Sequence, residues 1–209
     1  MAELVDNMSQ FLTVLLCCCI SALYYIRSRR QAWFLMTCIY GCFALGGLYW
    51  TLYYFLFRET PQVFYVAEIA WISSYIFFFL LQYALSDEQE RTFRCPAAWL
   101  SPLVGVPLMV FYCMHGDVLS SIIMSVLIML MAWNAIRGLI WLRGRGREAR
   151  DMRRVHAVIL AFAVLEQCLW FSSCFWISDT LSNPYFWFDF MLTASFLALL
   201  PSVKKVVGP

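Results

Sequence analysis

Three acidic residues lie inside long apolar stretches of the sequence, where ionised groups are costly: Glu68, Glu166 and Asp189. Acids at membrane depth normally face the interior of a helical bundle or a water-filled cavity. If the three share such a cavity, their carboxylates would attract the positive group of a small molecule. The chemistry predicted from them is therefore the binding of a small cationic or amine-bearing ligand.

Helical spacing gives each acid a set of neighbours. Steps of three, four or seven residues place polar and aromatic side chains on the same helix face as the acid. The three faces are Phe64, Glu68, Trp71, Tyr75 and Gln82; Glu166, Trp170 and Ser173; and Tyr185, Asp189, Thr193 and Phe196. If they meet, these faces would enclose a pocket open toward the outside, with the acids facing the charge of the ligand. The rings predicted to stack on the ligand by cation–π contact are Trp50, Trp71, Tyr75 and Trp170.

A structural alternative stands beside this prediction. A protonated acid inside a bundle can simply hydrogen-bond a neighbouring helix, which contributes about 0.6–2 kcal/mol. Tryptophan and tyrosine also gather at membrane interfaces regardless of function. Under this alternative the protein is a membrane subunit without a ligand, and the acids face helices in a dry core.

The sequence does not favour an enzyme. Its two histidines, His115 and His156, are far apart, and no metal-protease, nucleophile-elbow or phosphate-binding motif occurs. The last apolar stretch has no internal lysine that could carry a retinal, because Lys204 and Lys205 lie at its end. We predict no catalytic residue, no metal site and no cofactor.

Composition identifies the elements that must position the acids. Of the 209 residues, 63% are hydrophobic and 13% charged, against about 25% charged residues in a soluble domain. The apolar residues form runs near the ~20 residues that cross a membrane as a helix. We predict an all-α, polytopic membrane protein whose residues 1–209 form one domain of seven transmembrane helices, at about 8–26, 32–57, 61–85, 97–114, 118–142, 155–178 and 184–202.

Charge predicts the orientation of this bundle. With seven helices, 14 of the 15 Lys and Arg residues fall on one side, and only Arg58 falls on the other. Because basic residues remain in the cytoplasm, the N-terminus is predicted outside and the C-terminus inside a cell membrane. The arginine-rich segment 143–154 is then expected to touch anionic lipid headgroups, so the partner predicted for it is the lipid bilayer and not a nucleic acid.

A weak internal repeat divides the helices into three, one and three. Leu48-Tyr49-Trp50, Pro61 and Glu68 in the first half correspond to Leu169-Trp170, Pro184 and Asp189 in the second. Both halves would have the same orientation in the membrane, as in parallel repeats that hold a site at their interface. Chance similarity between aromatic-rich helices is the alternative.

Part of the first half resembles a known class of protein. The residues Tyr49, Trp50, Pro61, Glu68, Trp71 and Tyr75 resemble the multi-helix sensor regions that precede kinase or cyclic-dinucleotide output domains in bacterial signalling proteins. The resemblance covers residues 48–75, and Glu68 stands where an aspartate is expected. It implies a bacterial membrane sensor that signals through an output domain or through a separate cytoplasmic partner.

Two functions therefore remain open. The first is a sensor or receptor-like protein that binds a small ligand outside and passes a change of helix packing to a cytoplasmic signalling partner. The second is a small-solute transporter made of two three-helix repeats, in which the same acids would bind substrate or a coupling proton.

Overall fold

The chain folds into helices because its apolar runs leave no other way to pair the backbone. The computed structural model describes residues 2–57, 59, 65–176 and 178–208. In this part of the chain the elements are α1 (Ala2–Ser28), α2 (Gln31–Phe57), α3 (Tyr65–Leu85), α4 (Glu88–Thr92), a 3₁₀ turn (Pro96–Trp99), α5 (Leu100–His115), α6 (Val118–Trp141), α7 (Arg147–Ser173) and α8 (Pro184–Val207).

Seven of these helical segments are long and apolar enough to cross a membrane, as predicted. They are 20–27 residues long, so each rises at least about 30 Å along its axis. Their outward faces carry large apolar side chains. Leu103 on α5 is 71% exposed and Leu45 on α2 is 62% exposed, which suits contact with lipid and not with water.

The helix ends differ from the predicted limits where polar residues continue a helix. α1 begins at Ala2 instead of residue 8, and α7 begins at Arg147 instead of residue 155 and ends at Ser173 instead of residue 178. Arginine and glutamate form helices well, so the starts of α1 and α7 extend past their apolar runs, whereas the end of α7 is shorter than predicted. The predicted start of the third helix at Pro61, the repeat residue Pro61 and the side chain of Phe64 lie outside the described residues, as does Arg58.

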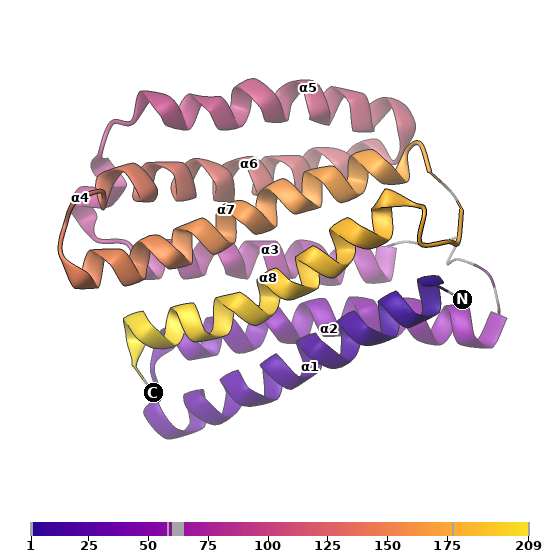
Figure 1. Ribbon diagram of the computed structural model, residues 1–209, viewed down its shortest axis with the longest axis horizontal. Coiled ribbons are helices and arrows are strands. Elements are labelled where there is room, and N and C mark those ends of the chain that lie inside the picture. Colours follow the sequence, from indigo (N-terminus) through magenta and orange to yellow (C-terminus); the bar gives the residue numbers. More distant parts are fainter. Residues whose placement is uncertain (1, 58, 60–64, 177, 209) are drawn as a thin grey trace.

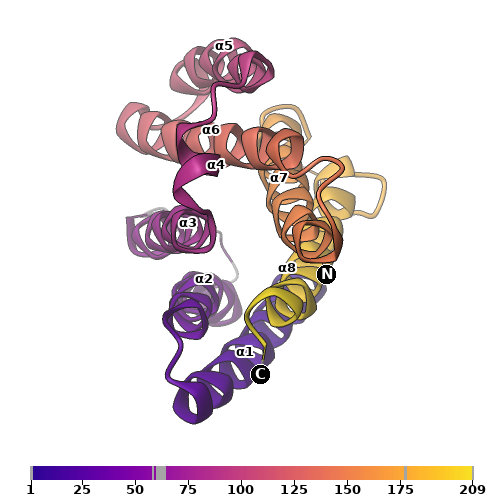
Figure 2. The same ribbon diagram turned by 90° about the vertical axis from the view of Figure 1, so that its left-hand side faces the viewer.

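Six long helices form a closed ring. α1 packs on α2, α2 on α3, α3 on α6, α6 on α7, α7 on α8, and α8 packs back on α1. α5 lies outside this ring against α6 (Figure 2). The helices α1–α3 and α6–α8 are thus two arcs of three connected by α5. The internal repeat in the sequence stays a prediction.

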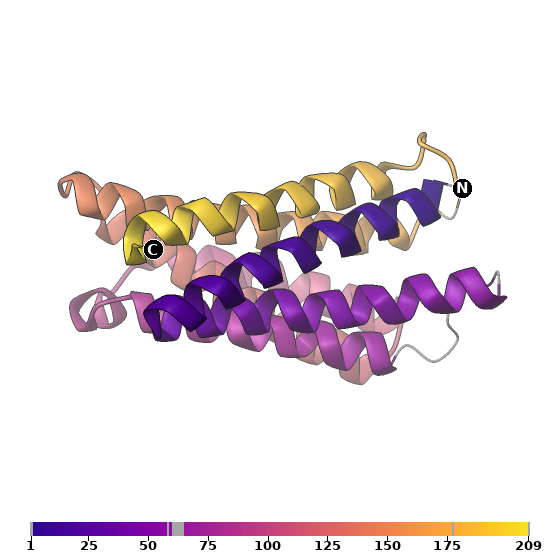
Figure 3. The ribbon, with the colours of Figure 1, turned by 90° about the horizontal axis from the view of Figure 1, so that it is seen from below.

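The two ends of the bundle differ in charge. α1 begins and α8 ends at opposite ends, as Figures 1 and 3 show. Fourteen Lys and Arg residues lie at or near one end, in the turns α1–α2, α3–α5 and α6–α7, in the helix turns beside them and in the last turn of α8. We call this the basic end. It also holds α4, which was not predicted and which begins where the Asp87 carboxylate accepts a hydrogen bond from the Glu90 amide at 2.6 Å.

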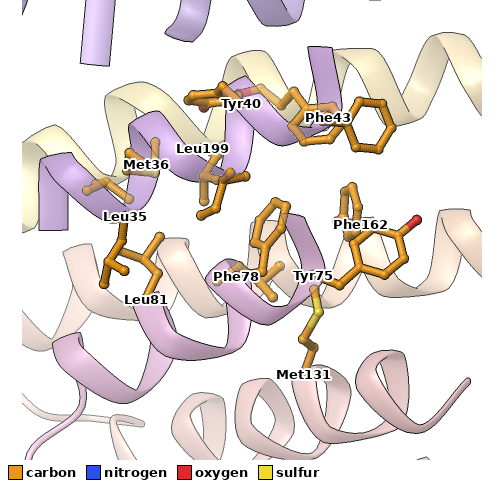
Figure 4. Close-up of a cluster of buried hydrophobic side chains, with 14 of the residues drawn as sticks. Leu35, Met36, Tyr40, Phe43, Tyr75, Phe78, Leu81, Met131, Phe162 and Leu199 are labelled. Atoms are coloured by element: carbon orange, nitrogen blue, oxygen red, sulfur yellow. The ribbon is translucent and has the colours of Figure 1, made fainter. Parts of the chain in front are cut away.

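Aromatic residues fill the middle of the ring. Phe78 of α3, Phe162 of α7 and Phe196 of α8 are at most 1% exposed, and their ring centres are 4.7–6.0 Å apart. Figure 4 shows Phe43, Tyr75, Phe78 and Phe162 gathered at this level. We call Phe78, Phe162 and Phe196 the phenylalanine plug, since they close the ring between its two ends.

Candidate functional site

All seven residues predicted to bind a ligand line one cavity, which has a volume of about 690 Å³. It lies at the end of the bundle opposite the basic end, because its lining comes from the starts of α1, α3, α6 and α8 and from the ends of α2, α5 and α7. Residues of the α7–α8 turn also line it, so it extends to the end of the bundle. The three predicted helix faces thus meet in part, because their members Gln82, Thr193 and Phe196 do not line the cavity.

Glu166 lies deepest among the predicted acids and bridges two helices. It is on α7, is 2% exposed, and its Oε1 accepts a hydrogen bond from the Tyr75 hydroxyl of α3 at 2.5 Å. Trp170 follows one turn later on the same wall. On the side of the phenylalanine plug, the Tyr75 ring packs edge-on against the Phe162 ring, with 5.7 Å between the ring centres. The plug therefore fixes the position of the Tyr75 hydroxyl that donates to Glu166.

Asp189 is held by α1, a helix to which the sequence assigned no role. The carboxylate is 3% exposed, and its Oδ1 accepts a hydrogen bond from the side-chain amide of Gln10. α1 and α8 pack along each other and both begin at the cavity end. The contact therefore closes the ring at the level of the site.

Glu68 occupies the opposite wall. It lies in the first turn of α3, and its Oε2 accepts a hydrogen bond from the Ser120 hydroxyl of α6 at 2.6 Å. The backbone amide of Ser120 donates in turn to the Asp117 carboxylate at 2.9 Å, which caps the start of α6. Glu68 is half-buried, so it joins α3 to α6 while remaining in contact with the cavity.

The mouth of the cavity adds two further acids. The backbone amide of Glu3 donates to the Asp179 carboxylate at 2.8 Å, which ties α1 to the α7–α8 turn. The indole Nε1 of Trp50 lies 3.4 Å from Glu3 Oε1. Trp50 is therefore part of the site and does not only belong to an aromatic belt at the membrane interface.

A glycine sets the position of the Trp71 ring. A Cβ atom at Gly46 would lie 2.5 Å from the Trp71 indole nitrogen, so α2 must carry a glycine for this ring to pack there. Trp71 also lies 6.0 Å from Trp50 and 6.2 Å from Phe43, measured between ring centres. These tilted rings form an aromatic wall between the Glu68 and Asp189 sides of the cavity.

The charge of the cavity is strongly one-sided. Its described lining contains six carboxylates and one histidine: Glu3, Glu68, Asp117, Glu166, Asp179, Asp189 and His115. No lysine or arginine is among these lining residues, and Arg58 lies outside the described part of the chain. The hydrogen-bond donors found to the acids are hydroxyl, amide and indole groups, which are neutral. Such a lining suits a cation with an apolar body.

Sequence reasoning missed the residues that depend on the ring closing. Gln10, Tyr112, Ser120 and Tyr185 line the cavity with Glu3, but only Tyr185 had been placed on a face with an acid. The sequence feature that could have indicated that α1 contributes to the site was the pair Asp6 and Gln10, which are one turn apart at the start of the first apolar run. In the described residues no group of three or more His, Cys, Asp or Glu side chains is arranged to hold a metal ion.

The Tyr75–Glu166 bond yields a quantitative prediction. Tyr75→Phe leaves the buried Glu166 carboxyl group without its hydroxyl donor, so unfolding in detergent micelles should require about 1.5–3 kcal/mol less free energy. Combined with Glu166→Leu, which removes the acceptor, the two effects should not add, and the coupling should reach about 1 kcal/mol or more. The control is Tyr75→Phe combined with Ser120→Ala, which should add. Additive effects in both pairs would show that the bond contributes nothing.

No protein-family model, curated protein or solved structure matches this chain. The likeness of residues 48–75 to membrane sensor regions therefore stays a prediction. The chemistry of the cavity is the basis for a proposal about function.

Proposed function

We propose that this protein is an integral membrane receptor or sensor that binds a small cationic, amine-bearing ligand in an outward-facing pocket. One observation carries the proposal: Glu68, Glu166 and Asp189 line a single cavity without a described lysine or arginine beside them. An ammonium group entering the cavity would supply the positive charge that these carboxylates lack. Trp50, Trp71, Tyr75 and Trp170 would enclose the organic part of the ligand.

Charge supports the proposed orientation. The described Lys and Arg residues gather at the end away from the cavity, and basic residues flanking spans remain in the cytoplasm. The cavity would then face the outside of a bacterial cell membrane. The basic end would contact anionic headgroups and, in a sensor, the cytoplasmic signalling partner.

Fusions at the C-terminus test this orientation. A C-terminal green fluorescent protein should be bright, because it folds in the cytoplasm, while a C-terminal bacterial alkaline phosphatase should be inactive, because it needs the oxidising outside. Whole-cell fluorescence and phosphatase activity measure the two outcomes. An active phosphatase fusion with a dark fluorescent one would invert the proposed orientation.

A transporter remains the second candidate, and the layout of the ring favours it. The arcs α1–α3 and α6–α8 meet at α3–α6 and at α8–α1, and the cavity lies between them. The phenylalanine plug separates this cavity from the basic end. Movement of one arc against the other would open the plug and expose the same acids to the cytoplasm.

Matched probes test the ligand class. Phenethylamine, which is an ammonium ion at neutral pH, should bind at least about tenfold more tightly than the neutral 2-phenylethanol, a difference of roughly 1.4 kcal/mol. Quenching of tryptophan fluorescence in detergent or lipid measures both. Glu68→Gln should weaken the binding of phenethylamine by about tenfold, whereas Glu148→Gln, the same change at an exposed position of the basic end, should not change it.

Two results of this binding experiment would count against the proposed site. Equal binding of the two probes, or unchanged affinity in Glu68→Gln, would contradict the proposed site. Proteoliposomes then separate the two functions, because saturable binding without uptake indicates a sensor and accumulation of phenethylamine indicates a transporter.

A further inference from the structure

A further buried acid lies beside the cavity. Asp6 of α1 is 1% exposed and neighbours Asp189 of α8. Gln10 follows Asp6 by one helical turn and donates to the same Asp189 carboxylate, so Asp6 and Gln10 face α8 together. Asp189 lines the cavity, whereas Asp6 does not. The two acids thus form a pair in which only one member faces the cavity.

The pair lacks the donors that two ionised carboxylates would need. Neither carboxylate oxygen of Asp6 has a hydrogen-bond partner, although both are buried. Two adjacent carboxylates repel each other in a poorly solvated place, and they coexist when one of them carries a proton and donates it to the other. A single proton between Asp6 and Asp189 would give one of the unpartnered Asp6 oxygens a partner and remove the repulsion.

The surroundings favour a proton over a metal ion. The titratable groups nearest the pair are Glu3 of α1, Tyr75 of α3, Glu166 of α7 and Tyr185 of α8; α2 contributes Phe43 and Trp50 to the lining. These groups supply no positive charge. The amide of Gln10 offers Asp189 an N–H group, which suits a carboxyl group, whereas a metal ion needs oxygen ligands at that point.

We propose that Asp6 and Asp189 form a proton-binding pair, which holds one proton at neutral pH and releases it to the cavity when a cation binds at Asp189. In the release step one carboxyl O–H bond breaks and the proton leaves through cavity water. The ammonium group of the ligand replaces its charge, so the net charge of the site is unchanged. The release step rests on the proposed ligand class, while the shared proton does not.

Infrared spectroscopy of the ligand-free protein in lipid tests the shared proton. The wild type at neutral pH should show the C=O stretching band of a protonated carboxyl group, part of which is lost in Asp6→Asn and, equally, in Asp189→Asn. Loss in both is expected because an asparagine amide can donate to the remaining carboxylate and keep it ionised. Glu68→Gln, the matched change on the opposite wall, should retain the whole band.

Other outcomes overturn the shared proton. If the band is unchanged in either asparagine variant, the pair does not hold the proton. Asp6→Glu keeps a carboxyl group at this position and should keep a shifted band, which excludes misfolding as the cause of a loss. A pair occupied by sodium would instead show no such band in sodium buffer and gain one when the sodium is dialysed out.

Proton release is measured with phenethylamine as the probe and a pH indicator in weak buffer. The wild type should release about one proton for each bound ammonium ion, because one positive charge replaces another, while Asp6→Asn should bind the probe and release none. Binding without release in the wild type overturns the exchange and leaves the proposed ligand class standing. An absence of binding overturns both the ligand class and the exchange, and the infrared bands still decide the shared proton.

Discussion

Carboxyl groups buried without a positive partner are the constraint on which this structure depends. Removing an ionised carboxylate from water costs several kcal/mol even after the protein relaxes. A hydrogen bond to a charged group returns about 1.5–3 kcal/mol. The hydroxyl of Tyr75 and the indole of Trp170 at Glu166, and the amide of Gln10 at Asp189, therefore offset only part of the cost. Water, protons or a bound cation must supply the remainder, and the cavity gives each of them access.

The same constraint explains how the ring closes. Each acid on one helix receives its donor from another: Glu166 on α7 from α3, Asp189 on α8 from α1, and Glu68 on α3 from α6. Two of these three bonds, at Asp189 and at Glu68, connect the helix pairs α8–α1 and α3–α6, where the two arcs meet. A ligand that draws these carboxylates toward its own charge would therefore pull on the contacts that set the spacing of the arcs. This would convert a change of charge in the cavity into a change of helix packing, which both a sensor and a transporter require.

Much of this arrangement was predictable from local sequence, and the rest depended on partners across the ring. The number of spans follows from run length, and the faces with Glu68, Glu166 and Asp189 follow from helical period. The role of α1 was not predictable in this way. Asp6 and Gln10 read as polar residues at the start of the first span, and only the packing of α1 on α8 turns them inward. α4 was missed because a five-residue helix has no periodic signal and depends on its Asp87 cap.

The central claim is that a cation from outside can occupy the cavity beside Glu166 and Asp189. A crystal structure with bound bromophenethylamine tests it most directly, because anomalous scattering locates the bromine without ambiguity. The account predicts bromine inside the cavity near Trp71, with the ammonium nitrogen within about 4 Å of a carboxylate oxygen of Glu166 or Asp189. Bromine found only on the lipid-facing surface, with these carboxyl groups sealed in a dry core, would contradict it.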